Sequence, residues 1–154
     1  ENENAAFFII KNIFKNKKHK LVIAGKKPSP SLKKLISKNK NIKLIKDPTE
    51  KEINNIIKKA HINILYTNQN TGIKLKLIES IYRGRFCIVN QKMIEGSEMD
   101  NYCHLASSKT SWISQIKKLE NKFFDEKEIL KRKNVEKLIN NKKEAKRIQK
   151  IIFN

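Results

Sequence analysis

The residues with the clearest chemical potential lie in the middle of the chain, where apolar and polar segments alternate. His61–Thr67 is a short apolar run typical of a buried parallel strand, and Asn68–Gly72 is a polar loop. Ile73–Tyr82 has apolar residues at helical spacing, Gly84 can end that helix, and Phe86–Val89 is a second apolar run. The pattern predicts a β-strand–helix–β-strand unit. Open α/β folds bind ligands at the carboxyl ends of such strands.

Three kinds of group in this unit could bind a phosphorylated, hydroxyl-bearing ligand. Backbone N–H groups of Thr71, Gly72 and Ile73 at the predicted helix start favour an anion such as a diphosphate, although Thr71 could equally be an ordinary N-cap. Lys74, predicted one turn inside the helix, could neutralise phosphate. The Glu79 carboxylate, about two turns inside, can accept two hydrogen bonds from a cis-diol such as ribose. Helical spacing fits a solvent-facing Glu79 equally well.

The segment TGIKLKLIES, followed by GRFCIVN, resembles the C-terminal half of retaining GT-B glycosyltransferases of the bacterial group 1 (family 4-like) type. The family motif runs acidic residue, Gly, several residues, Leu-Glu-Ala or similar, then Gly and a strand. The resemblance implies that Glu79 binds the ribose hydroxyls of a nucleotide sugar, and Gly72 matches the first Gly. Thr71 departs from the motif, because the family has there a Glu that contacts the donor sugar.

Two further loops are expected at the same edge of the sheet. Gly25 and Lys26 follow a predicted strand, and a Gly there permits close backbone approach. The loop around Pro48 corresponds to the place where the resembled family holds the nucleotide base. No GxGxxG fingerprint is present, which disfavours NAD binding.

The resemblance carries expectations about activity and partners. It implies the donor half of a glycosyltransferase that transfers a hexosyl group from UDP- or GDP-sugar to a glycan or lipid-linked acceptor. It implies no cofactor and no obligatory metal, and it offers no assignable catalytic residue. The expected location is cytoplasmic, with a peripheral position at the inner face of an anionic membrane as the second option. The acceptor-binding N-terminal half and the first strand of the domain are expected to lie outside these residues, so we expect nucleotide binding with little transfer.

Charge and composition leave two alternatives open. The chain has 154 residues with 35 Lys and Arg against 15 Asp and Glu, a formal net charge of +20. A basic nucleic-acid-binding α/β domain would fit this charge. However, only four of the basic residues are Arg, which nucleic-acid readers favour for bidentate contacts. A degenerate, non-catalytic transferase module would fit Thr71.

Neither metal chemistry nor a membrane span is predicted. His19, His61 and His104 are scattered, and Cys87 and Cys103 lack a CxxC partner, so no zinc site is expected. The chain also lacks a run of about 18 apolar residues.

Alternation of strands and helices predicts one α/β domain over residues 1–154. We expect a Rossmann-like three-layer domain: a mainly parallel sheet of about five strands, helices on both faces and a C-terminal helical tail. The expected elements are helix Asn2–Lys17, strand Lys20–Gly25, helix Leu32–Ser37 capped by Ser31, strand Ile42–Ile45, a helix to Lys59 with a Thr49/Glu52 capping box, the central unit, a short strand Tyr102–Ala106, helix Ser108–Phe124 and a tail Asp125–Phe153.

Overall fold

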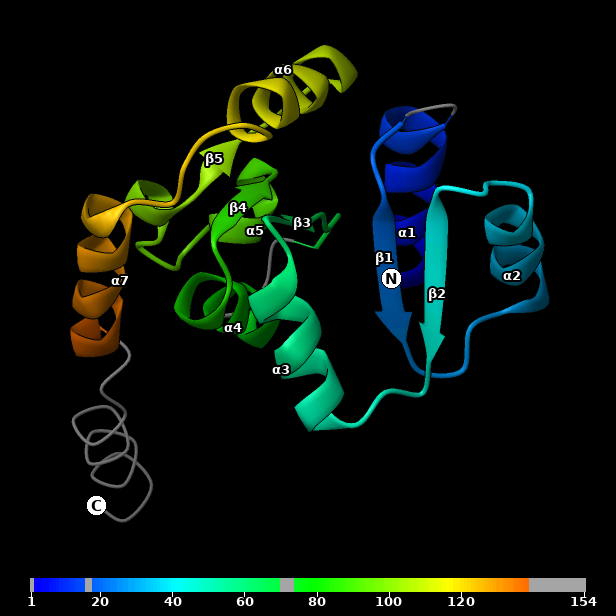
Figure 1. The fold of residues 1–154 in the computed structure, drawn as a ribbon, viewed down its shortest axis with the longest axis horizontal. Helices are drawn as coiled ribbons and strands as arrows, with labels where there is room; N and C mark the ends of the chain where they lie inside the picture. The colour runs from blue at the N-terminus through cyan, green and yellow to red at the C-terminus, as the bar shows by residue number, and fades with distance from the viewer. Residues whose placement is uncertain (1, 16–17, 70–73, 139–154) are drawn as a thin grey trace. The chain divides into compact units, whose positions relative to one another are not determined.

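The computed structural model describes residues 2–15, 18–69 and 74–138 (Figure 1). The chain divides into two compact units, Glu1–Lys122 and Phe123–Asn154. The second unit contains helix α7 (Glu126–Leu138), where Arg132 stacks over the Phe124 ring with 4.3 Å between guanidinium carbon and ring centroid. All strands of the described residues lie in the first unit.

Strands and helices alternate through the first unit, as predicted. In chain order they are α1 (Asn2–Ile9), the π-helix η1 (Ile10–Phe14), β1 (Leu21–Gly25), α2 (Pro30–Ser37), β2 (Ile42–Lys46), α3 (Glu50–Lys59), β3 (Ile62–Leu65), α4 (Leu75–Arg83), β4 (Phe86–Val89), α5 (Gln91–Ile94), the 3₁₀ helix η2 (Asp100–Tyr102), β5 (His104–Leu105) and α6 (Lys109–Leu119).

The strands form two small sheets, and the prediction of one five-strand sheet is wrong. Strands β1 and β2 pair in parallel, and β3, β4 and β5 form a second, all-parallel sheet with β4 in the centre. The parallel direction and the number of strands agree with the sequence. Periodicity shows that a segment is a strand, but it cannot show which strands pair. In the described residues β1 and β3 share no hydrogen-bonded ladder.

The first helix is built on the predicted apolar stripe. Its expected core positions are all buried: Ala5, Ala6, Ile9, Ile10, Ile13 and Phe14. The helix changes from α to π geometry at Ile10 and ends at Phe14, earlier than predicted. The aromatic ring of Phe8 stacks on Tyr66, which follows β3, with ring centroids 4.0 Å apart. This helix therefore contacts the segment that follows β3.

The predicted N-cap of α3 is confirmed, and that of α2 is corrected from Ser31 to Ser29. The Thr49/Glu52 capping box of α3 is confirmed: the Glu52 backbone N–H donates to Thr49 Oγ1, and the Glu52 carboxylate accepts from the Thr49 N–H. The cap of α2 is Ser29, whose Oγ accepts from the Leu32 N–H at 3.2 Å, and Ser31 is not the cap. Pro30 explains the shift, because its missing N–H and fixed φ suit the first helical position.

Gly84 ends α4 as predicted, but a close packing contact is what requires a glycine. A Cβ at Gly84 would lie 2.2 Å from the Asn63 side-chain nitrogen and 2.5 Å from the Ser80 carbonyl oxygen. The end of α4 can therefore approach β3 only without a side chain at this position. No helix among the described residues is long and apolar enough to cross a membrane.

The capping box gives a stability prediction. We expect Thr49→Ala to lower the free energy of unfolding by about 1 kcal/mol, because the Glu52 N–H loses its side-chain acceptor. Thr49→Ser keeps the hydroxyl and should retain most of the stability. Urea unfolding of the three proteins measures the difference. Equal midpoints for the Ala and Ser variants would contradict the assignment of the cap.

A pH prediction follows from the same box. Hydrogen bonds from the Thr49 backbone N–H and hydroxyl hold the pKa of Glu52 below its ordinary value of 4.5. Stability contributed by ionised Glu52 is therefore complete above about 4.5 and is lost as the pH falls through the lower, folded-state pKa. Glu52→Gln should show a shallower fall in urea midpoint between pH 4.5 and 3, whereas the exposed control Glu95→Gln should follow the parent protein.

Candidate functional site

The loops after β1 and β2 are fastened together at the carboxyl edge of the first sheet. The Asp47 backbone N–H donates to the Gly25 carbonyl at 3.0 Å, and the Asp47 carboxylate accepts from the Lys27 backbone N–H at 2.8 Å. Lys27 and Asp47 both have a left-handed φ of 47°. The predicted residues Gly25, Lys26 and Pro48 thus lie in neighbouring loops, with Lys26 exposed and Pro48 buried.

Gly25 leaves open space at this edge. A Cβ built on Gly25 would meet no atom within 4 Å, in contrast to Gly84. A ligand could therefore approach the Gly25 backbone, but packing within the protein does not require a glycine there.

Asn90 fastens the loops at the carboxyl edge of the second sheet. Its amide nitrogen donates to the Thr67 carbonyl at 2.7 Å, and its amide oxygen accepts from the Thr67 N–H at 3.1 Å. Beside this pair, the Lys92 ammonium donates to the Asn68 carbonyl at 3.3 Å, and the Tyr66 hydroxyl donates to the Asn68 side chain at 2.7 Å. The end of β4 thereby fixes the loop that leaves β3.

The start of α1 contacts the loop after β1 and the first turn of α4. The Glu3 carboxylate accepts from the Ser29 N–H at 2.7 Å, and this hydrogen bond lowers the pKa of Glu3. The Lys76 ammonium of α4 donates to the Asn2 side chain at 3.0 Å. The helix start ahead of β1 therefore lies between the loop after β1 and the beginning of α4. The carboxyl ends of the two sheets meet around it.

The predicted anion-binding start of the α4 helix is described only from Lys74 onward. Thr71, Gly72 and Ile73 lie outside the described residues, so their proposed phosphate contacts have no structural account. Helix α4 begins at Leu75, and the half-buried Lys74 is its N-cap residue. The expectation that Lys74 lies one turn inside the helix is therefore wrong, and its side chain is placed at the helix start.

Glu79 is the fifth residue of α4, little more than one turn from the start rather than two. Its carboxylate accepts a hydrogen bond from the Arg83 guanidinium, one turn further along the helix. The Glu79 side chain is 43% exposed, and the pairing raises the pKa of Arg83. The carboxylate of Glu79 therefore already has a cationic partner in the protein.

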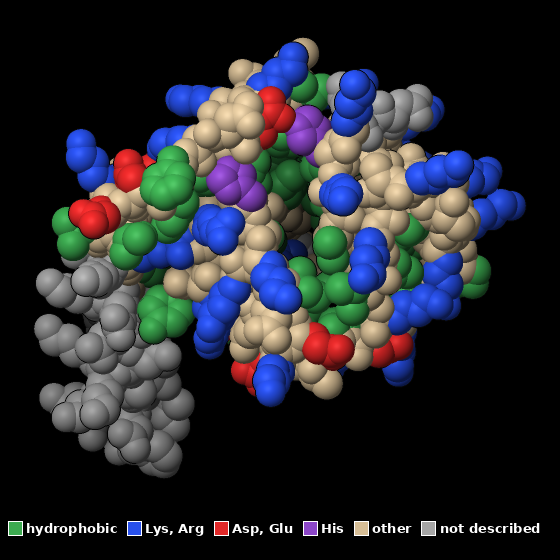
Figure 2. Space-filling view, viewed as in Figure 1, with side chains coloured by type: hydrophobic (Ala, Val, Ile, Leu, Met, Phe, Trp, Pro, Cys, Tyr) green, Lys and Arg blue, Asp and Glu red, His purple; other side chains and the backbone are tan. Residues whose placement is uncertain are grey.

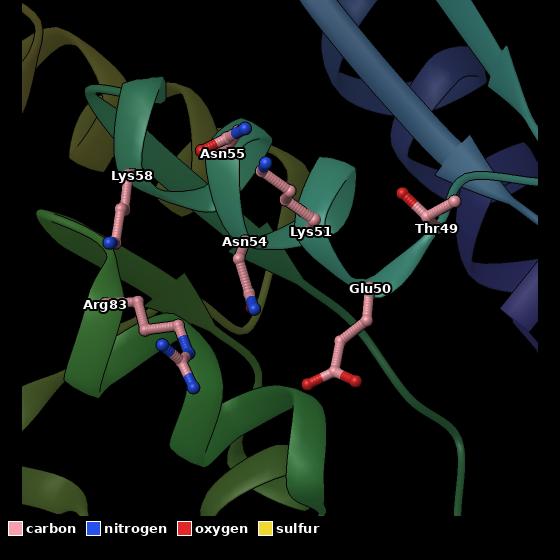
Figure 3. Close-up of a pocket in the computed structure, with 7 residues that line it drawn as sticks. All are labelled: Thr49, Glu50, Lys51, Asn54, Asn55, Lys58 and Arg83. Atoms are coloured by element: carbon pink, nitrogen blue, oxygen red, sulfur yellow. The ribbon is translucent and has the colours of Figure 1, made fainter.

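A shallow surface pocket lies between α3 and α4, on the side where Arg83 projects. Figure 3 shows that α3 contributes Asn54 and Lys58, and α4 contributes Arg83. The complete lining is Thr49, Glu50, Lys51, Asn54, Asn55, Lys58 and Arg83. None of the predicted nucleotide-binding residues belongs to this set. The pocket thus borders the end of the loop after β2 only at Thr49, the N-cap of α3, and contains neither Gly25, Lys26 nor Pro48.

The sequence interpretation missed the polar residues that close the second sheet. Thr67 is 1% exposed, and Asn90 follows directly after the four buried residues of β4. Both positions carry a detectable signal, because each is the first polar residue after an apolar strand. The carboxyl ends of neighbouring parallel strands meet at one edge, which is where such a pair should form.

The assembled edge offers hydrogen-bond donors, amides and ammonium groups, a set suited to a polar, anionic ligand. Among the residues that the structure describes, no cluster of three His, Cys, Asp or Glu side chains could hold a metal ion. Figure 2 shows Lys and Arg side chains spread over the visible face rather than gathered in one patch.

The fold and site define an α/β protein with parallel strands and a polar carboxyl edge. Comparison of the chain with protein-family models, curated proteins and solved structures finds no match.

The Asn90–Thr67 pair gives a prediction that tests this edge. Asn90→Ala should lower the free energy of unfolding by about 1–3 kcal/mol, because the buried Thr67 N–H and carbonyl both lose their partner. Asn90→Asp can still accept from the N–H and should lose less stability. The exposed Asn101→Ala serves as the control. Urea unfolding measures all three, and an Asn90→Ala midpoint equal to that of the control would contradict the role of this pair.

Proposed function

We propose that this chain is the donor-nucleotide half of a GT-B glycosyltransferase and binds a UDP- or GDP-sugar. The observation that supports this most is the gathering of the linked loops after β1 and β2 and the first turn of α4 around the start of α1. Open α/β folds bind nucleotides at the carboxyl ends of their strands. The sequence resemblance around Glu79 supplies the chemical class.

Each predicted residue has a defined role in this proposal. Lys26 and Lys74 lie at the ends of the two sheets and would neutralise the diphosphate. A diphosphate is also the leaving group of sugar transfer, so the same cations would stabilise the charge that develops on it. Glu79 would exchange its Arg83 partner for the ribose hydroxyls. Acceptor binding and transfer require the other half of such an enzyme.

A degenerate, partner-binding module is the second candidate. The Glu79–Arg83 ion pair favours it, because a carboxylate already held within the helix gains less from a ribose diol. Thr71 in place of the sugar-binding Glu points the same way. This candidate keeps the fold and predicts no saturable nucleotide binding.

Calorimetric titration of UDP and GDP at moderate salt tests the proposal. We expect one nucleotide to bind with saturation, and Glu79→Ala to weaken it by about 1–3 kcal/mol, the scale of a hydrogen bond to a charged group. Lys74→Ala should weaken both nucleotides alike, because it contacts phosphate and not the base. Glu95→Ala removes an equal charge elsewhere and should leave binding unchanged.

Two other results would overturn the proposal. Absence of binding to either nucleotide, with the protein folded by circular dichroism, would favour the degenerate module. Equal weak binding of both nucleotides that salt abolishes, together with steep salt-dependent affinity for duplex DNA, would indicate nonspecific charge attraction.

A further inference from the structure

The pocket between α3 and α4 has a chemistry of its own. Its volume is about 610 Å³, within the range of small-molecule pockets. Three cations, Lys51, Lys58 and Arg83, line it together with one carboxylate, Glu50. The excess of positive charge favours an anionic ligand over a neutral or cationic one.

Helix α3 contributes one polar face to this pocket. The lining residues of the helix are spaced three and four positions apart, which places them on one side of it: Lys51, Asn54, Asn55 and Lys58. Figure 3 shows that Asn54 and Lys58 point from this side of α3 toward the side of α4 that carries Arg83. An ammonium group and an amide therefore border the same space as the guanidinium.

Arg83 is the residue whose geometry points most clearly to an oxyanion. Its Nε–H donates to the Glu79 carboxylate, one turn earlier in α4, and its guanidinium carbon lies 5.8 Å from the centroid of the Tyr82 ring. An arginine has five N–H donors, so the bond to Glu79 leaves the four at the outer end of the guanidinium. These four donors form a planar fork that matches two oxygens of a phosphate group.

The contact with Glu79 prepares Arg83 for such a ligand. A guanidinium that is already held at Nε loses less side-chain entropy when its outer end binds. The Arg83 side chain is 30% exposed, so its stem is packed while its end can reach a ligand. Only four of the 35 basic residues are Arg, so the general richness in Lys does not account for an Arg at this position.

We propose that the pocket between α3 and α4 binds the phosphate group of a small phosphomonoester, with Arg83 as bidentate donor, Lys58 as second cation and Glu79 as the residue that positions Arg83. A phosphomonoester has three free oxygens, so two can accept from the guanidinium while the third faces the Lys58 ammonium. A phosphodiester has only two. The Asn54 amide can donate and accept, which suits hydroxyl groups next to the phosphate.

This site does not rest on the proposed nucleotide binding, but the two share Glu79. In the nucleotide proposal Glu79 releases Arg83 and binds ribose, whereas here it stays on Arg83. A nucleotide bound through Glu79 should therefore weaken phosphate binding in the pocket, and phosphate should weaken the nucleotide by the same factor. A chain that binds phosphate here and binds no nucleotide would support this site and overturn only the nucleotide proposal.

NMR titration with inorganic phosphate tests the site. At about pH 8 phosphate is mostly the dianion, because its second pKa is near 6 in phosphoesters. Sodium chloride keeps the ionic strength constant, so that nonspecific attraction is screened equally throughout. The readout is the backbone amide signals of residues 54, 58 and 83, which every variant retains. We expect all three signals to shift with saturation.

Two pairs of variants separate the fork and its positioning from charge alone. Arg83→Lys keeps the charge and loses the planar fork, and should bind phosphate at least about tenfold more weakly, the scale of a hydrogen bond to a charged group. Glu79→Gln and Glu79→Ala both remove the negative charge, but Gln keeps an acceptor for the Arg83 Nε–H. Glu79→Ala should therefore bind about threefold or more weakly than Glu79→Gln, because its guanidinium must be ordered on binding.

Two controls identify the ligand class and the site. Dimethyl phosphate represents the phosphodiester of nucleic acids and phospholipids, and should bind more weakly than inorganic phosphate because it has fewer free oxygens and a smaller charge. Lys74→Ala changes the proposed nucleotide site and should leave the phosphate shifts of residues 54, 58 and 83 unchanged.

Four outcomes would overturn the proposal or one of its parts. Absence of saturable shifts in the folded protein would mean that the pocket binds no phosphate. Equal affinity of Arg83→Lys and the parent chain would indicate charge attraction without a fork. Equal affinity of Glu79→Ala and Glu79→Gln would remove the positioning role of Glu79. Equal binding of dimethyl phosphate would exclude selectivity for a monoester.

Discussion

The buried stripe of α1 and η1 is the contact on which the first unit depends. Strands β1 and β3 share no ladder, so backbone hydrogen bonds do not join the two sheets in the described chain. Ile10, Ile13 and Phe14 are 1%, 2% and 5% exposed, and burial of each such side chain is worth about 1.5–3 kcal/mol. Side-chain packing thus has to hold the two sheets together, as backbone hydrogen bonds between strands do in a continuous parallel sheet.

The same helix positions the candidate site. Its first turn accepts from Ser29, which follows β1, and from Lys76 in α4. Of the two cations predicted at a diphosphate, Lys26 follows β1 of the first sheet, and Lys74 caps α4, the helix that follows β3 of the second sheet. The distance between Lys26 and Lys74 therefore depends on how α1 packs against the elements of both sheets, because the segment that carries each lysine is connected only to its own sheet. A substitution in the buried face of α1 would therefore change the distance between the two lysines without replacing any residue of the site.

The sequence predicted what local periodicity and capping determine. The six apolar positions of α1 and the Thr49/Glu52 box are local patterns, and both are confirmed. The Glu79–Arg83 pair is also local, at the i, i+4 spacing that favours ion pairs, and could have been predicted. Strand pairing could not be predicted, because the residues of β1 and β3 would be the same whether or not these two strands were hydrogen-bonded to each other. The residues 71–73 at the centre of the predicted site lie outside the described structure.

The candidate site depends on how firmly the two sheets are held relative to each other. Ligand binding that spans two loops gains affinity when the loops are already held at the required distance, because less ordering entropy is lost on binding. Because β1 and β3 do not pair with each other, side-chain packing and a few polar contacts fix that distance in the described residues. Packing of the buried α1 side chains and affinity for a diphosphate are therefore expected to be coupled, even though none of those side chains belongs to the proposed site.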